Sequence, residues 1–159
     1  MRNTGKEIEK VGLKKRLLQL CVKLIEERIA TIAEAMANAQ ANANAEEKSS
    51  AGDKYETSRA MSHLEKDMHA TQLAANRNEL AALFNIDCSR VNDLATPGSL
   101  IRCADCSFFI AAGIGKVNFE GEAIYILSPG APLAKLFFNK KRGSSITFNK
   151  REIIIVDVF

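Results

Sequence analysis

The sequence contains no tryptophan and few helix-breaking residues, because its three prolines and six of its nine glycines all lie beyond residue 96. It also lacks any apolar run near the roughly 20 residues that cross a bilayer, so we expect no membrane span. Residues 1–10 are charged and contain no apolar stretch ending in a small-residue cleavage site. We therefore expect no secretory signal and a cytoplasmic protein.

Cysteines are few and the net charge is small. Four cysteines in 159 residues are too few for a disulfide scaffold, so we expect free thiols. A net charge of +3 is too small to predict a protein that wraps nucleic acid. A phosphate-binding loop and a nucleophile elbow are absent from the sequence, and Gly113-Ile114-Gly115 lacks the rest of a dinucleotide fingerprint. We therefore do not expect a nucleotide-binding enzyme.

The stretch from residue 6 to about residue 45 contains no proline, and its only glycine is Gly12. Its apolar residues recur at alternating intervals of four and three, which is the spacing of a coiled-coil seam. The seam residues are Leu18, Val22, Ile25, Ile29, Ile32 and Met36. The charged residues on the faces away from the seam are expected to be exposed to solvent; they are Lys14, Lys15, Arg16, Glu26, Glu27 and Arg28.

A second helical pattern follows a polar break at residues 48–52. Its expected seam consists of Met61, Leu64, Met68, Thr71 and Ala75, joined further on by Leu80, Leu83 and Phe84. Two long helices joined by a short turn pack most economically as an antiparallel hairpin. We therefore predict a coiled-coil hairpin over residues 1–84, with its turn at about residues 46–56.

Beyond the hairpin the pattern changes to that of an α+β domain. Residues 85–97 are typical of a linker, and residues 98–159 of a small antiparallel sheet domain. Strands are expected at residues 99–104, 108–112, 123–127, 145–148 and 153–159, with one or two helical turns at residues 132–139. Pro132 suits the first position of that helix, where its missing N–H has no cost.

The expected turn of the hairpin is acidic. Asp53 and Glu56 are three residues apart at the start of the second helix, so both carboxylates could lie on one face and share a Mg²⁺ ion. The same spacing fits a capping box, in which the acids only satisfy N–H groups of the first helical turn. Glu46 and Glu47 add negative charge before the turn.

Other candidate chemistry is weaker. Cys103 and Cys106 form half of a zinc knuckle without a matching second half, so two small side chains at a strand and turn are the simpler interpretation. His63 and His69 are expected on the solvated face of the second helix. Basic residues 140–142 and 150–151 could form a soluble loop or a docking patch for an acidic partner.

Two segments carry a resemblance to a known family. Residues 52–56 read Gly-Asp-Lys-Tyr-Glu, and residues 126–140 read Ile-Leu-Ser-Pro-Gly-Ala-Pro-Leu-Ala-Lys-Leu-Phe-Phe-Asn-Lys. The first resembles the Gly-Asp-x-x-Glu tip of the Gre family of bacterial transcript-cleavage factors, and the second resembles that family's Ser-Pro-Leu-Gly-Lys-Ala-Leu-Leu-Gly-Lys signature. The arrangement of a long hairpin followed by a small sheet domain is also similar, so the resemblance covers nearly the full length.

The resemblance implies an FKBP-like sheet domain that docks at the rim of the RNA polymerase secondary channel, and a hairpin that enters the channel. It implies that Asp53 and Glu56 are catalytic and hold Mg²⁺ jointly with the polymerase, with no tightly bound cofactor of the chain's own. They would promote cleavage of backtracked RNA, so contact with nascent RNA is indirect. The implied docking residues are Pro132, Leu133, Lys135 and Lys140, and a monomer is expected.

Three alternatives stay open at this stage. Residues 57–60 read Thr-Ser-Arg-Ala where the family usually continues Asn-Ala-Glu-Tyr, so the chain could be a polymerase-channel regulator that does not cleave. An FKBP-like domain on a helical arm could also be a peptidyl-prolyl isomerase or chaperone. A third possibility is an interaction protein whose hairpin is a dimerisation rod.

Overall fold

The computed structural model describes the backbone of residues 4–47 and 53–159; in these ranges the side chains of residues 46, 47, 53–55 and 58 are not described. The chain is α+β, as the sequence predicts. Helices α1 (Thr4–Glu47) and α2 (Asp53–Phe84) precede six strands and a short third helix, α3 (Pro132–Phe137). None of the described helices has the length and apolar character needed to cross a membrane.

The chain forms two compact units whose limits differ from the predicted boundaries at residues 84 and 97. One unit is Ile25–Ala81, which contains the greater part of both long helices. The other unit joins Met1–Leu24 to Ala82–Phe159, so the first part of α1 belongs with the sheet. Residues 86–99, which include the predicted linker 85–97 except its first residue, have no helix or strand, yet Cys88 and Ala95 within them are buried.

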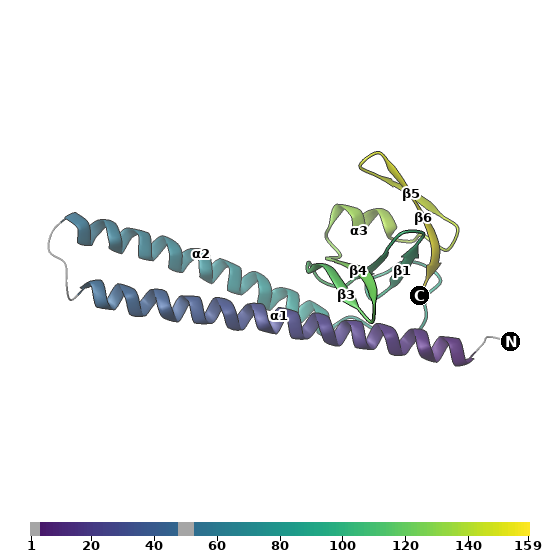
Figure 1. Cartoon of the computed structure of the whole chain (residues 1–159), viewed down its shortest axis with the longest axis horizontal. Coiled ribbons are helices and arrows are strands. Elements are labelled where there is room, and N and C mark those ends of the chain that lie inside the picture. Colours follow the sequence, from purple (N-terminus) through teal and green to yellow (C-terminus); the bar gives the residue numbers. More distant parts are fainter. Residues whose placement is uncertain (1–3, 48–52) are drawn as a thin grey trace. The chain divides into compact units, whose positions relative to one another are not determined.

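Within the unit Ile25–Ala81, α1 and α2 lie alongside each other (Figure 1). The expected seam of the first helix is at least partly buried at every position, from Leu18 to Met36. The least exposed positions of α2 follow intervals of four and three, which is the spacing expected for one face of a helix. They are His69, Leu73, Asn76, Leu80 and Leu83; Ser62 and Glu79 are the other half-buried residues among the described side chains of α2.

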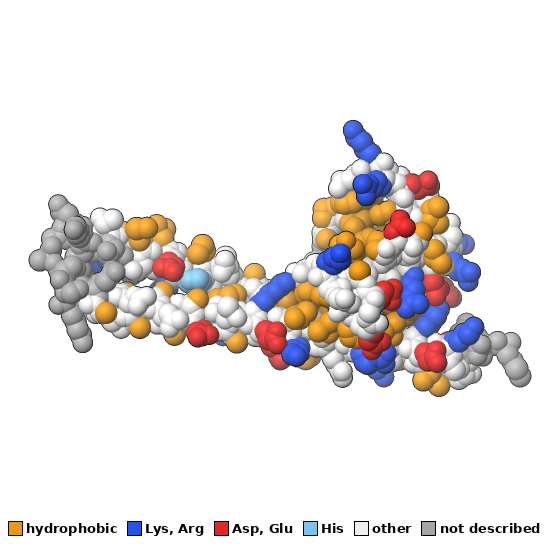
Figure 2. Space-filling model, viewed as in Figure 1, with side chains coloured by type: hydrophobic (Ala, Val, Ile, Leu, Met, Phe, Trp, Pro, Cys, Tyr) orange, Lys and Arg blue, Asp and Glu red, His pale blue; other side chains and the backbone are white. Residues whose placement is uncertain are grey.

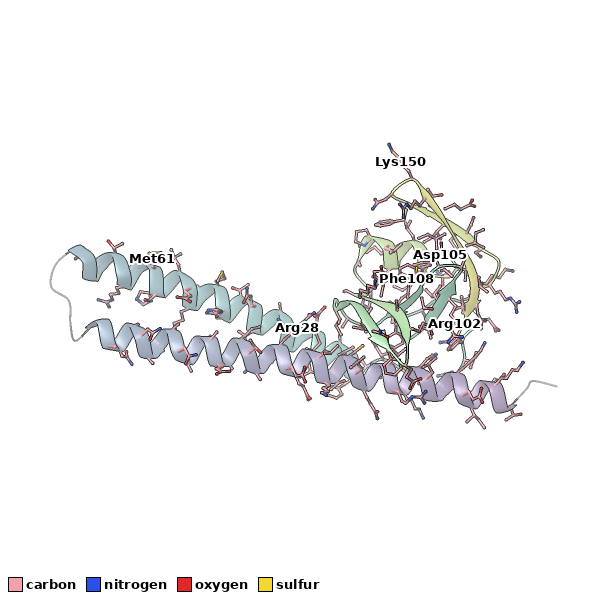
Figure 3. The ribbon with its side chains drawn as sticks, viewed as in Figure 1. Arg28, Met61, Arg102, Asp105, Phe108 and Lys150 are labelled. Carbon is pink, nitrogen blue, oxygen red and sulfur yellow. The ribbon has the colours of Figure 1, made fainter. Side chains whose placement is uncertain are left out.

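The predicted seam of the second helix is therefore wrong over most of its length. Met61, Leu64 and Met68 are 66%, 69% and 53% exposed, and Thr71 and Ala75 are exposed as well. Figure 3 shows Met61 on the outer side of α2. The predicted pattern joined two apolar stripes that are out of phase, and only the stripe with Leu80 and Leu83 is turned inward. Phe84, which was added to that seam, is 69% exposed.

The sheet domain has six strands in the order β3-β4-β2-β1-β6-β5. The strands are β1 (Leu100–Cys103), β2 (Ser107–Ile110), β3 (Gly115–Phe119), β4 (Glu122–Leu127), β5 (Ser145–Phe148) and β6 (Arg151–Val158). Strands β2 and β4 pair in parallel, and the other pairs are antiparallel. Strand β3 was not predicted, because it is an edge strand with polar and half-exposed residues and so lacks an apolar signal.

Apolar side chains cover both faces of this sheet. On one face a buried cluster joins sheet residues to α3, and the Phe108 and Phe137 rings are 5.1 Å apart. Successive residues of a strand point to opposite faces, so Phe109 next to Phe108 is buried on the other face. The first part of α1 lies against that second face: Lys10 is 2.7 Å from Asp157 of β6.

Candidate functional site

The acidic segment lies where the two long helices meet the 48–52 break. Asp53 is the first residue of α2, and Glu56 is exposed in the first turn of that helix. Glu46 and Glu47 are the last two residues of α1. The side chains of Asp53, Glu46 and Glu47 lie outside the described residues, so the predicted metal site is placed only by its backbone.

The partial charges at the two helix ends favour one pair of acids and disfavour the other. The N-terminal end of a helix carries a partial positive charge, which favours Asp53 and Glu56 at the start of α2. The C-terminal end carries a partial negative charge, which disfavours Glu46 and Glu47 at the end of α1. The last turn of α1 also contains no basic residue. The helix dipole therefore accounts for the acids of α2 and leaves those of α1 unexplained.

The predicted docking residues are on α3 and the loop after it. Pro132 occupies the first helical turn, as expected, and is exposed together with Lys135 and Lys140. Leu133 is half-buried against the core cluster, so part of its side chain holds α3 on the sheet. The backbone of Lys140 is fixed, because its carbonyl accepts a 2.8 Å hydrogen bond from the Ala95 N–H. These positions are ordered and solvent-accessible.

The basic residues 140–142 and 150–151 of the sheet domain are all exposed. Residues 140–142 lie in the loop that precedes β5, and Lys150 lies in the turn between β5 and β6, where Figure 3 labels it. Asn149 and Lys150 both have positive φ, of 50° and 64°, as the two central residues of a tight hairpin turn require. Figure 2 shows Lys and Arg side chains at the turn between β5 and β6. Exposed cations on short, fixed turns can contact an acidic surface with little loss of entropy.

Metal ligands do not gather elsewhere in the part of the chain that is described. Among those residues, no group of three or more His, Cys, Asp and Glu could hold a metal ion. Burial raises the pKa of Cys103 to about 12, and it raises the pKa of Cys106 as well, so both are thiols at neutral pH. His63 is exposed, as predicted, but His69 is half-buried in the seam, 3.6 Å from Glu65.

Lys14 is the charged residue for which the sequence was most misleading, because it was expected in solvent. Its side chain is 0% exposed, and its Nζ donates a 2.9 Å hydrogen bond to the carbonyl of Arg90. Burial lowers the pKa of Lys14, and charges on Cys88 and Asp87 partly oppose that effect. No pattern in the sequence marks this burial, because it depends on the fold of residues 86–99 against α1.

In comparisons with known proteins, no family model matches the chain, and no curated protein matches it.

Proposed function

We propose that this protein is a Gre-like transcription elongation factor that binds RNA polymerase through its secondary channel and promotes cleavage of backtracked RNA. In this proposal α1 and α2 form an antiparallel coiled-coil hairpin, the sheet domain is FKBP-like, and the acids near residues 46–56 meet the polymerase active site. The resemblance of residues 52–56 and 126–140 to the Gre signatures motivates the proposal.

The observation that carries the proposal is the accumulation of acids where two helix ends meet. Glu46 and Glu47 stand at the negative end of the α1 dipole, next in sequence to the break that precedes Asp53. The dipole of α1 disfavours two negative charges at this end of the helix. Acids at a position that the dipole disfavours fit a role in which a cation binds there in a complex.

Asp53 and Glu56 are the residues that would hold Mg²⁺ jointly with the polymerase. Two carboxylates suit Mg²⁺, which is usually bound through one or two protein carboxylates and completes its shell with other oxygen ligands. When bound, the ion stabilises the attacking and leaving oxygens of phosphoryl transfer. Glu56 is exposed and therefore accessible to such a partner.

A second candidate is a channel-bound regulator that does not cleave. Arg59 is exposed three residues after Glu56, so the two side chains are neighbours on one helix face. A guanidinium there competes with a metal ion for the carboxylate and weakens a catalytic site. Both candidates require binding to the polymerase, and they differ only in what the acids do afterwards.

Binding is tested with the full chain and core RNA polymerase by equilibrium fluorescence. Reversing two exposed charges in the variant Lys135→Glu/Lys140→Glu should weaken binding by about tenfold at low salt and by less at high salt, because the attraction is screened. The double variant Lys6→Glu/Lys116→Glu is the matched control, since it makes the same change in net charge at two exposed lysines of the same unit. We expect it to bind like the wild type.

Two results would contradict the docking assignment. The first is wild-type protein that shows no saturable binding to the polymerase. The second is equal weakening by Lys6→Glu/Lys116→Glu and by Lys135→Glu/Lys140→Glu, which would indicate only a general effect of net charge.

A further inference from the structure

Cys103 and Cys106 face each other across the turn between β1 and β2. The register of this antiparallel pair places Arg102 opposite Ser107, so the next opposed pair is Cys103 and Cys106. The N–H of Cys103 donates a 2.9 Å hydrogen bond to the carbonyl of Cys106, which holds the two backbones together. Figure 3 marks this turn by the label of Asp105, which lies between the two cysteines in sequence.

This backbone geometry suits a disulfide. The hydrogen bond between Cys103 and Cys106 makes this a hydrogen-bonded pair, whose Cα atoms are about 5.5 Å apart in antiparallel strands, which falls within the range of about 4.4–6.8 Å found for disulfides. Opposed side chains also point to the same face of the sheet. Both cysteines pack against the core cluster of that face, as this arrangement requires.

The surroundings favour a disulfide over a metal site. Both side chains are only partly buried, so a small reagent can reach them. Structural zinc needs four ligands, and among the described residues this pair belongs to no group of three or more His, Cys, Asp and Glu that could hold a metal ion, although Asp105 lies between the two cysteines in sequence. The remaining cysteines, Cys21 and Cys88, are 0% and 5% exposed and are therefore protected.

We propose that Cys103 and Cys106 form a redox-active pair that a low-molecular-weight disulfide, such as glutathione disulfide, converts to an intramolecular disulfide. One cysteine thiolate attacks the reagent, forms a mixed disulfide and releases one glutathione thiolate, which takes up a proton. The other cysteine loses its proton, attacks the protein sulfur of the mixed disulfide and releases the second glutathione. The protein loses two protons and two electrons, and the reagent is reduced to two thiols.

The raised pKa values of both thiols make this exchange slow at neutral pH and faster at alkaline pH, because the thiolate is the attacking species. The product closes the β1–β2 turn covalently and fixes the register of two central strands. This inference does not depend on the proposed function in transcription.

The chain itself offers a clean assay. Trypsin cleaves after Arg102 and next after Lys116, so both cysteines fall on one peptide, and Cys21 and Cys88 fall on two others. The full-length protein is equilibrated with mixtures of reduced and oxidised glutathione, quenched with acid, alkylated and digested. Mass spectrometry then measures the fraction of peptide 103–116 that has lost two hydrogens without gaining an alkyl group.

We expect the equilibrium constant for disulfide formation to be at least about tenfold higher in native protein than in concentrated urea, because the folded turn holds the sulfurs together. Cys21 and Cys88 should stay reduced in the same native sample. The variant Cys106→Ser should stop at a mixed disulfide on Cys103.

Each of three results would overturn the proposal. One is an equilibrium constant that is the same or lower in native protein than in urea. Another is a native sample in which Cys103 and Cys106 carry only separate glutathione adducts. The third is equal oxidation of Cys21 and Cys88, which would show that the reagent reacts with unfolded chains.

Discussion

Two leucines of α2 provide a matched test of which face of the helix is turned inward. Leu83 is 0% exposed, whereas Leu64 is 69% exposed. The same substitution, Leu to Ala, can be made at both positions of the same helix. The small change in helix propensity is similar at both sites, so the difference between the two variants reports burial.

The structure gives the expected sizes. Leu83→Ala removes a fully buried side chain and leaves a cavity, which typically costs about 2–5 kcal/mol. Leu64→Ala removes a side chain that is already largely in water, so its free energy of unfolding should change by less than about 0.5 kcal/mol. For a chain of this length, about 2–5 kcal/mol corresponds to a fall in Tm of roughly 5–15 °C.

Urea and thermal unfolding followed by far-UV circular dichroism measure both variants. An unchanged slope of free energy against urea would show that the surface exposed on unfolding is the same as in the wild type. If Leu64→Ala proved as destabilising as Leu83→Ala, α2 would turn its Met61, Leu64 and Met68 face toward α1. The assignment of the Leu73, Leu80 and Leu83 face as the buried face of α2 would then be refuted.

Two further variants test local features of the sheet unit. Gly98→Ala should lower the free energy of unfolding by roughly 2 kcal/mol or more, because φ of Gly98 is +89° and an added Cβ would lie 2.7 Å from Cγ2 of Ile86. Gly115→Ala should cost only about 1 kcal/mol, because Gly115 has the same φ but an added Cβ there would have no atom within 4 Å. Equal losses for the two variants in urea unfolding would contradict the steric argument. Burial lowers the pKa of Lys14 in the folded protein below 10.5. At pH values between the folded and the unfolded pKa of Lys14, the unfolded chain therefore binds more protons than the folded protein. The free energy of unfolding of the wild type should rise with pH in this range, by at most about 1.4 kcal/mol per pH unit. Lys14→Met should abolish that rise and the exposed control Lys15→Met should keep it; identical pH profiles of the two variants would show that Lys14 is not buried.

The sequence was informative where one signal dominates. The absence of proline and the 3-4 spacing predicted the two long helices, and α2 begins at Asp53 directly after the predicted break. The predicted strands contain apolar, β-branched residues that are buried in the sheet. Strand β3 was missed because an edge strand needs apolar residues on one face only, and GKVNF has too few to stand out.

The buried face of α2 and the burial of Lys14 could be identified only from the three-dimensional structure. The face of α2 is decided by Leu73, Leu80 and Leu83, and it draws the polar Asn76 and His69 into the seam, which no apolar pattern reveals. Lys14 is buried by residues distant in sequence, so its spacing in α1 carried no sign of it. Asp53 and Glu56 were placed at a helix start from the sequence alone, and their role stays a prediction.

The most direct test of the account is transcript cleavage in stalled, backtracked RNA polymerase complexes from the same organism, measured across Mg²⁺ concentrations. We expect the wild-type protein to accelerate Mg²⁺-dependent cleavage and the variant Asp53→Asn/Glu56→Gln to lose that acceleration while still binding the polymerase. Glu34→Gln, which removes an exposed carboxylate from α1, is the control and should cleave like the wild type. Wild-type protein that binds the polymerase without accelerating cleavage, or a double variant that cleaves normally, would contradict the assignment of Asp53 and Glu56 as the catalytic acids.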